Sequence, residues 1–110
     1  MDNELTVNMD IGTESVKFTI IGRIYSSNAD IFEKHLEKAL EEKIYNMVLN
    51  MSQVEYISSI GIRVILKKYM EVKKAGGKLE IEMPSEGVMN VLRITALDGM
   101  LVQPNNPGNI

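Results

Sequence analysis

Residues 44–51, with the sequence IYNMVLNM, form a run that is mostly apolar on both faces of an extended chain. A strand of this kind has to be covered on its two sides, which is typical of a central strand in a parallel sheet. Parallel neighbours are joined by crossover connections, and most of these are helices. The run therefore predicts an α/β fold with helices on each side of the sheet.

The first quarter of the chain has the period of extended strands. Apolar residues alternate with polar ones in residues 5–9 and again in residues 16–20, and Gly12 and Thr13 between them favour a turn. This pattern predicts an N-terminal β-hairpin that ends near Gly22.

Three later segments have the spacing of amphipathic helices. Their core faces consist of apolar residues, mostly three or four positions apart: Phe32, Leu36, Ala39 and Leu40 in the first, Ile62, Ile65, Leu66, Tyr69 and Val72 in the second, and Val88, Val91 and Leu92 in the third. Ser27 or Asn28 is a suitable N-cap for the first helix and Ser85 for the third, while Gly76 favours the end of the second. Alternation in residues 79–83 predicts a strand nearer the sheet edge.

The element order is therefore ββαβαβα, in a mixed four-stranded sheet with helices packed on it and right-handed crossovers between the parallel strands. With 110 residues the chain has the length of a single domain, which we place at residues 1–102. Residues 103–110, QPNNPGNI, have no apolar period and are expected to form a flexible C-terminal tail.

Composition narrows the classes of function. A net charge of −3 and the lack of a basic stripe argue against a nucleic-acid partner. The sequence has no cysteine, no signal-like N-terminus and no apolar run long enough to cross a bilayer. We therefore expect a cytoplasmic protein that does not associate with membranes.

Catalytic and ligand-binding motifs are missing from the sequence. His35 is the single histidine, so no set of zinc ligands can be assembled, and we expect no metal and no cofactor. Neither the phosphate-binding motifs GxxxxGK[ST] and GxGxxG nor the nucleophile motif GxSxG occurs. The sequence predicts a protein that is not an enzyme and has no catalytic residues.

The segment YISSIGI places two serines where the central strand passes into the second helix. It resembles the signature of STAS domains of the anti-sigma factor antagonist type, in which an Asp-Ser-Ser/Thr-Gly-Leu segment opens a helix. In this match Ser58 takes the place of the aspartate, and Ser59 takes that of the phosphorylatable serine. Ile60 replaces the second small hydroxyl residue, and Gly61 and Ile62 match the Gly-Leu pair.

Further segments resemble the family's pattern, so the likeness extends over residues 4–102. These segments are Gly22-Arg23-Ile24 after the second strand, Gly76-Gly77-Lys78-Leu79 before the fourth, and Val91-Leu92 with Leu97-Asp98 near the third helix. The chain departs from the family at Ser58, which replaces the aspartate, and at Tyr25, where many members have aspartate. It also lacks the amphipathic C-terminal helix that is common in the family.

The resemblance implies a STAS-like fold and the function of an anti-sigma factor antagonist. Such a protein binds an anti-sigma factor that is a serine protein kinase, and thereby regulates transcription that depends on a sigma factor. Phosphorylation at Ser59, or as second choice at Ser58, would switch it off. ATP would belong to the kinase, and the chain itself is expected to be a monomer or a weak homodimer.

The spacing of the second helix indicates where such a partner would bind. Because its core residues face the sheet, a second stripe at i, i+3, i+4 and i+7 is expected to face outward. This stripe, the two serines and the loop after the second strand form the predicted partner-binding set of Tyr25, Ser26, Ser27, Asn28, Ser58, Ser59, Ile60, Arg63, Val64 and Lys67.

Three other interpretations stay open. In the first, Ser58 or Ser59 is only an N-cap, which contributes about 1 kcal/mol to helix stability. In the second, which the missing aspartate at position 58 favours, the chain is a scaffold subunit that binds a transport ATPase without any phosphate cycle. A role in binding small molecules or nucleotides rests only on the general capacity of helix N-termini for anions.

Overall fold

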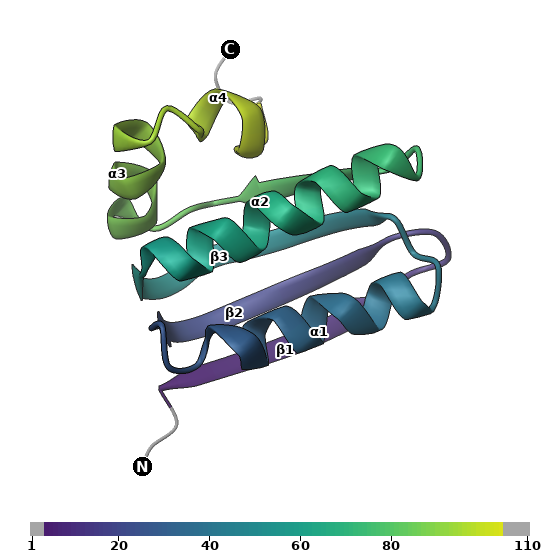
Figure 1. Ribbon diagram of the computed structural model, residues 1–110, viewed down its shortest axis with the longest axis horizontal. Coiled ribbons are helices and arrows are strands. Elements are labelled where there is room, and N and C mark those ends of the chain that lie inside the picture. The colour runs from purple at the N-terminus through teal and green to yellow at the C-terminus, as the bar shows by residue number, and fades with distance from the viewer. Residues whose placement is uncertain (1–3, 105–110) are drawn as a thin grey trace.

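The computed structural model describes residues 4–104, which form a mixed four-stranded sheet with helices packed on it (Figure 1). The predicted α/β fold and the order ββαβαβα are confirmed, with one short helix added at the end. The elements are β1 (Leu5–Ile11), β2 (Val16–Ile24), α1 (Ala29–Glu41), β3 (Asn46–Ile57), α2 (Ser59–Lys74), β4 (Lys78–Glu82), α3 (Glu86–Ile94) and α4 (Asp98–Leu101).

The N-terminal hairpin forms where the alternation predicts it. β1 and β2 are antiparallel, with Leu5 opposite Gly22 and Ile11 opposite Val16. β2 and β3 are parallel, as are β3 and β4, and α1 and α2 supply the crossovers. The sheet order β1-β2-β3-β4 follows the chain order, so each strand lies beside the next one in sequence.

The two long helices, α1 and α2, cover the same face of the sheet (Figure 1). Met47 and Leu49 of β3 point to this face and are buried. The expectation of helices on each side of the sheet is wrong, because the opposite face carries polar pairs across its strands that are stable in water. Lys17 Nζ lies 2.8 Å from a carboxylate oxygen of Glu82, and Asn50 Nδ2 donates to the same oxygen at 3.2 Å.

β3 is longer than predicted and continues to Ile57 rather than ending at residue 51. Its pairing with β2 shifts register between Asn50 and Gln53. At this irregularity Asn50 Oδ1 accepts hydrogen bonds from the backbone N of Ser52 at 3.0 Å and from its Oγ at 2.8 Å. The polar residues Asn50 and Ser52 therefore form a bulge within the strand.

α3 lies beside the second half of β3, beyond the end of β4. Ser85 is its N-cap as predicted, because its Oγ accepts a hydrogen bond from Val88 N at 3.2 Å. The same Oγ donates to Val54 O at 2.6 Å, and Ser85 N donates to Met51 O at 3.1 Å. The cap of α3 thus also bonds the helix to β3.

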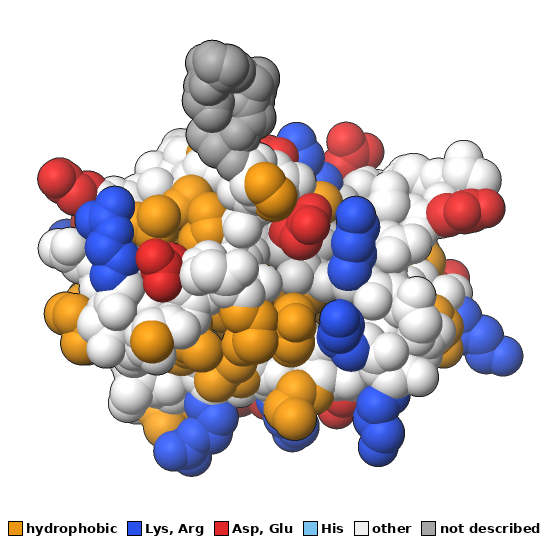
Figure 2. All heavy atoms as spheres, turned by 90° about the horizontal axis from the view of Figure 1, so that it is seen from above, with side chains coloured by type: hydrophobic (Ala, Val, Ile, Leu, Met, Phe, Trp, Pro, Cys, Tyr) orange, Lys and Arg blue, Asp and Glu red, His pale blue; other side chains and the backbone are white. Residues whose placement is uncertain are grey.

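The C-terminal segment covers part of the outer edge of β4. Val102 forms a parallel bridge with Ile81, and Gln103 N donates to Ile81 O at 2.9 Å. Figure 2 looks onto this side of the molecule and shows hydrophobic side chains lying between charged ones. Of the predicted flexible tail, residues 105–110 lie outside the described residues.

A buried ion cluster joins α1 to α2. The side chain of Lys68 is 1% exposed, and its ammonium contacts the carboxylates of Glu33 at 3.3 Å, Glu71 at 3.0 Å, and Glu37. Burial by itself lowers the pKa of Lys68, but the hydrogen bonds to Glu37 and Glu71 outweigh it, and the pKa is raised. The pKa of Glu33 is lowered, mainly by a hydrogen bond from Lys67 Nζ at 3.1 Å.

We expect the free energy of unfolding to depend on pH through this cluster. Glu33, whose pKa is lowered, stabilises the fold above its unfolded pKa of about 4.3, and this contribution is lost as the pH falls through the folded value. Lys68, whose pKa is raised, stabilises the fold below its unfolded pKa of about 10.4, and this contribution is lost as the pH rises through the folded value.

Lys68→Met should therefore lower the free energy of unfolding by about 1–2 kcal/mol at neutral pH, because the three partly exposed carboxylates lose their shared cation. The difference from the wild type should shrink at acid pH, where Glu33 is protonated in both proteins. Urea unfolding across the pH range measures this, with Lys74→Met, at an exposed lysine of the same helix, as the control. An equal loss in both variants at every pH would contradict the role of the cluster.

Candidate functional site

The two serines between β3 and α2 differ in their environment. Ser58 is the N-cap of α2: its Oγ accepts a hydrogen bond from Gly61 N at 3.2 Å, and its N donates to Ile24 O at 2.8 Å. Its side chain is buried, with 8% of the residue exposed. Ser59 is the first residue of α2 and is exposed. The interpretation of a serine as an N-cap thus holds for Ser58, whereas Ser59 lies at the surface.

Gly61 allows the first turn of α2 to pack closely against the sheet. A Cβ at this position would lie 2.7 Å from Cγ1 of Ile57 and 2.8 Å from Cγ2 of Ile24. Both isoleucines are buried, so a larger residue would have to displace well-packed side chains. The start of α2 is therefore held against the ends of β2 and β3, and Ser59 is fixed at that end of the sheet.

The loop between β2 and α1 lies at the same end of the sheet (Figure 1). Asn28 fixes its shape, because Oδ1 accepts a hydrogen bond from Tyr25 N at 2.8 Å and Nδ2 donates to Arg23 O at 3.1 Å. The ring of Tyr25 packs against that of Tyr56, with centroids 5.6 Å apart and planes inclined by 40°. Tyr56 is 47% exposed, so the two rings form an aromatic surface at the same end of the sheet as Ser59.

Charged groups of both signs surround this aromatic pair. The guanidinium of Arg23 lies 2.8 Å from a carboxylate oxygen of Glu55 and 3.4 Å from one of Glu4. The side chain of Tyr25 and the carboxylate of Glu55 raise the pKa of Arg23, which therefore stays cationic. On α2, Arg63 is exposed one turn after Ser59 and forms no ion pair within residues 4–104.

Most of the predicted partner-binding residues are accessible. Those that are exposed or half-buried are Tyr25, Ser26, Ser27, Asn28, Ser59, Ile60, Arg63 and Lys67. The prediction that Val64 faces outward is wrong, because the residue is 6% exposed. It lies on the same side of α2 as Lys68, which contacts carboxylates of α1. Packing between the two helices therefore removes Val64 from the surface.

Tyr56 and Glu55 belong to this surface but are absent from the predicted set. They fall in the part of β3 that the sequence pattern does not assign to the strand. The run of β-branched and aromatic residues in QVEYI, residues 53–57, favours a strand and is the signal that could have found them. We use "partner surface" below for Tyr25, Tyr56, Ser59, Ile60 and Arg63.

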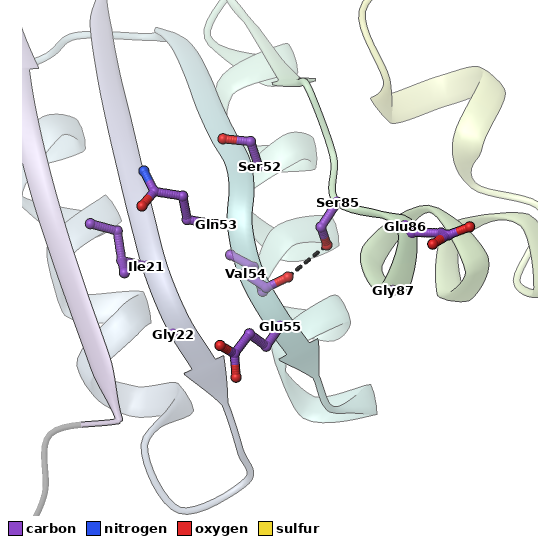
Figure 3. A pocket seen from close by; sticks show the side chains of 9 residues that line it. All are labelled: Ile21, Gly22, Ser52, Gln53, Val54, Glu55, Ser85, Glu86 and Gly87. Atoms are coloured by element: carbon purple, nitrogen blue, oxygen red, sulfur yellow. Dashed lines mark hydrogen bonds between the residues drawn. The ribbon is translucent and has the colours of Figure 1, made fainter.

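A groove of about 610 Å³ opens on the face of the sheet that α1 and α2 leave uncovered (Figure 3). It lies where the bulge at Ser52 and Gln53 meets the start of α3, with Glu55 and Glu86 among the residues that line it. Glu55 lies between the groove and the surface around Tyr25 and Tyr56, because it lines the groove and its carboxylate pairs with Arg23. Tyr25, Tyr56, Ser59, Ile60 and Arg63 do not line the groove.

Among residues 4–104, no group of three or more His, Cys, Asp and Glu side chains is arranged to hold a metal ion. Among the described helices, none is long and apolar enough to cross a membrane.

Comparisons with known proteins agree with this architecture. A family model for the STAS domain matches residues 5–106. A curated relative, the anti-sigma-B factor antagonist of Bacillus subtilis (strain 168), is 26% identical over 99 residues, which cover 88% of this chain and 90% of that protein.

Two solved structures of the anti-sigma factor antagonist SpoIIAA have the same fold. The unphosphorylated form has a TM-score of 0.79, with 92% of this chain and 90% of that chain covered. The phosphorylated form, from Bacillus, has a TM-score of 0.72, with 92% and 93% covered. Both are 14% identical to this chain, so they show the likeness of fold alone.

Proposed function

The chain belongs to the STAS domain family, and from this membership we propose that it is an anti-sigma factor antagonist. Its partner is an anti-sigma factor that is also a serine protein kinase. Binding of the unphosphorylated chain sequesters this factor and frees a sigma factor for transcription. Phosphorylation of Ser59 by the kinase ends the binding.

The exposure of Ser59, at the same end of the sheet as an aromatic pair, is the observation that carries the proposal. Tyr25 and Tyr56 have the character of binding hot spots, because tyrosine buries a large area at little cost in side-chain entropy. Ser59 is accessible to a kinase, whereas Ser58 is buried and caps α2. Of the two serines, Ser59 is therefore our candidate for modification.

A phosphate on Ser59 is compatible with the folded state. The first residues of a helix have backbone N–H groups without intrahelical partners, and the helix dipole favours negative charge there. Arg63, one turn further along α2, is close enough to pair with an added phosphate. The modification therefore leaves the domain folded.

The same phosphate opposes binding. It adds a charge of about −1.5 to −2 at neutral pH. Within a packed interface this charge would lose its hydration, and it would repel any carboxylate of the partner. Phosphorylation therefore acts on the interface and not on the fold.

In this proposal the chain has no catalytic step of its own and needs no cofactor, because the kinase supplies the ATP. The protein acts in the cytoplasm, where sigma factors and RNA polymerase meet. It controls transcription through protein contacts, without binding nucleic acid or a membrane itself.

A pull-down from the native host, with mass spectrometry of bait and captured proteins, tests the proposal. We expect capture of an anti-sigma factor and a phosphate-sized increase in the intact mass of part of the bait. This increase should disappear in Ser59→Ala and persist in Ser58→Ala, which is the matched control because it removes the neighbouring hydroxyl.

Two results would count against the proposal. Persistence of the added phosphate in Ser59→Ala would place the modification elsewhere. Capture of a transport ATPase, with no phosphate on the bait, would support the scaffold-subunit alternative instead.

A further inference from the structure

The two outer edges of the sheet differ. At β4, Val102 and Gln103 bond to Ile81 and cover part of the edge. At the other margin β1 pairs only with β2, and within residues 4–104 no segment lies against its outer side (Figure 1). An uncovered edge strand presents a row of unpaired backbone groups to other chains.

The hydrogen bonds at the ends of the hairpin show which backbone groups of β1 point outward. Arg23 N donates to Glu4 O at 2.7 Å, and Gly12 N donates to Ser15 O at 2.7 Å. In an antiparallel pair, hydrogen-bonded residues alternate with residues whose N–H and C=O point the other way. The even-numbered residues of β1 therefore bond to β2. The outward-pointing groups belong to Leu5, Val7, Met9 and Ile11.

β1 has few of the features that protect edge strands. Its pairing with β2 is regular along its whole length, without a bulge, and the strand contains neither proline nor lysine. Leu5, Val7 and Met9 face the helix side of the sheet but are only half-buried, and Ile11 is 51% exposed. The edge therefore offers both hydrogen-bonding groups and apolar surface.

We propose that β1 is a homodimerisation edge, which pairs in antiparallel fashion with β1 of a second copy of this chain. The twofold axis passes at Asn8, so that residues whose numbers add up to sixteen lie opposite each other. This register places Leu5 opposite Ile11 of the second copy and Val7 opposite Met9. All four outward-pointing residues then form hydrogen-bonded pairs, and each pair exchanges two hydrogen bonds.

The side chains of β1 are complementary to themselves in this register. On the helix side, apolar residues meet apolar residues, so the exposed Ile11 packs against Leu5 of the second copy. On the open side, Asp10 lies opposite Thr6, and no two like charges of β1 face each other. A shift of the centre to Val7 or Met9 would leave outward-pointing groups unpaired at both ends. The register centred at Asn8 is therefore preferred.

α1 adds apolar surface next to this edge. Glu33 of α1 faces α2, because its carboxylate contacts Lys67 and Lys68. Ile31 lies on the opposite side of α1 from Glu33 by helical spacing, and it is 48% exposed. In a continuous sheet of two copies the two α1 helices become neighbours on one face. Ile31 would then be covered together with Ile11.

The proposed dimer leaves the partner surface free. Ser59 lies at the end of the sheet where β2 and β3 finish, and β1 begins at the same end. Antiparallel pairing of the two β1 strands directs these ends in opposite directions. Each copy can therefore bind its own partner, and dimerisation goes beyond the proposed function without depending on it.

Disulfide cross-linking tests the register, and the natural chain has no cysteine to interfere. Asn8→Cys places two thiols on a non-hydrogen-bonded pair whose Cα atoms are about 4.5 Å apart, within disulfide range. In this register Thr6 lies opposite Asp10, so the two thiols of Thr6→Cys would be four residues apart along the paired strands, or about 14 Å. We expect mild oxidation to cross-link Asn8→Cys with a second copy of itself. Thr6→Cys should cross-link only when it is mixed with Asp10→Cys. Equally fast linkage of Thr6→Cys and Asn8→Cys would overturn the register.

The oligomeric state in solution tests the interface itself. In sedimentation experiments the wild-type mass should rise with concentration from 12.4 kDa towards twice that value. Ile11→Lys should raise the dissociation constant by about tenfold or more. The matched control is Ile94→Lys, at an 84% exposed position on α3, which should leave the dissociation constant unchanged. A wild type that stays monomeric at millimolar concentration, or an equal effect of both variants, would overturn the proposal.

Discussion

Ser59→Asp should weaken binding of the anti-sigma factor by about 2–4 kcal/mol, or roughly 30- to 1,000-fold. The new carboxylate would lie in the proposed interface, where it would lose hydration without a prepared partner. Phosphorylation of Ser59 should have a larger effect, because phosphate has more charge than aspartate. Titration calorimetry with the purified anti-sigma factor measures the difference.

The fold should tolerate this substitution. Because Ser59 is the first residue of α2, an acidic side chain there is favoured by the helix dipole. We expect the free energy of unfolding to change by less than about 0.5 kcal/mol. Ser15→Asp is the matched control: Ser15 is exposed just before β2, at the opposite end of the sheet from Ser59. Equal binding by Ser59→Asp and the wild type would show that Ser59 lies outside the interface.

Arg63→Glu tests the same surface through a side chain that is not modified. Arg63 is exposed, so its replacement should reduce binding with little change in stability. Lys67 is a less direct test, because its ammonium bonds to Glu33 at 3.1 Å and its reversal would also disturb the contact between α1 and α2. Unchanged binding by Arg63→Glu would remove this part of α2 from the partner surface.

Gly22→Ala should lower the free energy of unfolding by about 3–4 kcal/mol, a large fraction of the stability of a small domain. Gly22 has a φ of +111°, which L residues rarely adopt. A Cβ there would also lie 1.9 Å from the carbonyl oxygen of Glu4. Since that oxygen accepts a hydrogen bond from Arg23 N, it cannot move without disturbing the end of the hairpin.

Gly76→Ala separates the two contributions. Gly76 also has a positive φ, +89°, but an added Cβ would meet nothing within 4 Å. We expect this variant to lose only about 1 kcal/mol, the cost of the backbone conformation. Urea unfolding of both variants measures the difference, which reports the close approach of Glu4 to Gly22. An equal loss in the two variants would mean that the backbone at Glu4 can move away from position 22 at little cost in free energy.

Local pattern predicts the elements of this fold well, but their boundaries less well. The alternation in β1 and β2 and the spacing of apolar residues in α2 place these elements correctly. The end of β3 is misplaced, because the mostly apolar run stops before polar Ser52, whereas the strand continues through a bulge there. Whether such residues end a strand depends on the pairing of its neighbours, which the local sequence does not contain.

The sequence by itself determines the order of strands and helices, the two serines at the start of α2 and the helical stripe that includes Arg63. These features depend on residues close together in the chain, whose spacing fixes their relative direction. The tertiary structure decides which sides of a helix are buried. Val64 and Lys68 of α2 are covered because α1 packs beside this helix. It also brings Tyr56 to Tyr25 and leaves the edge of β1 open. Burial is decided by neighbours distant in sequence, and no local period records which neighbour will lie there.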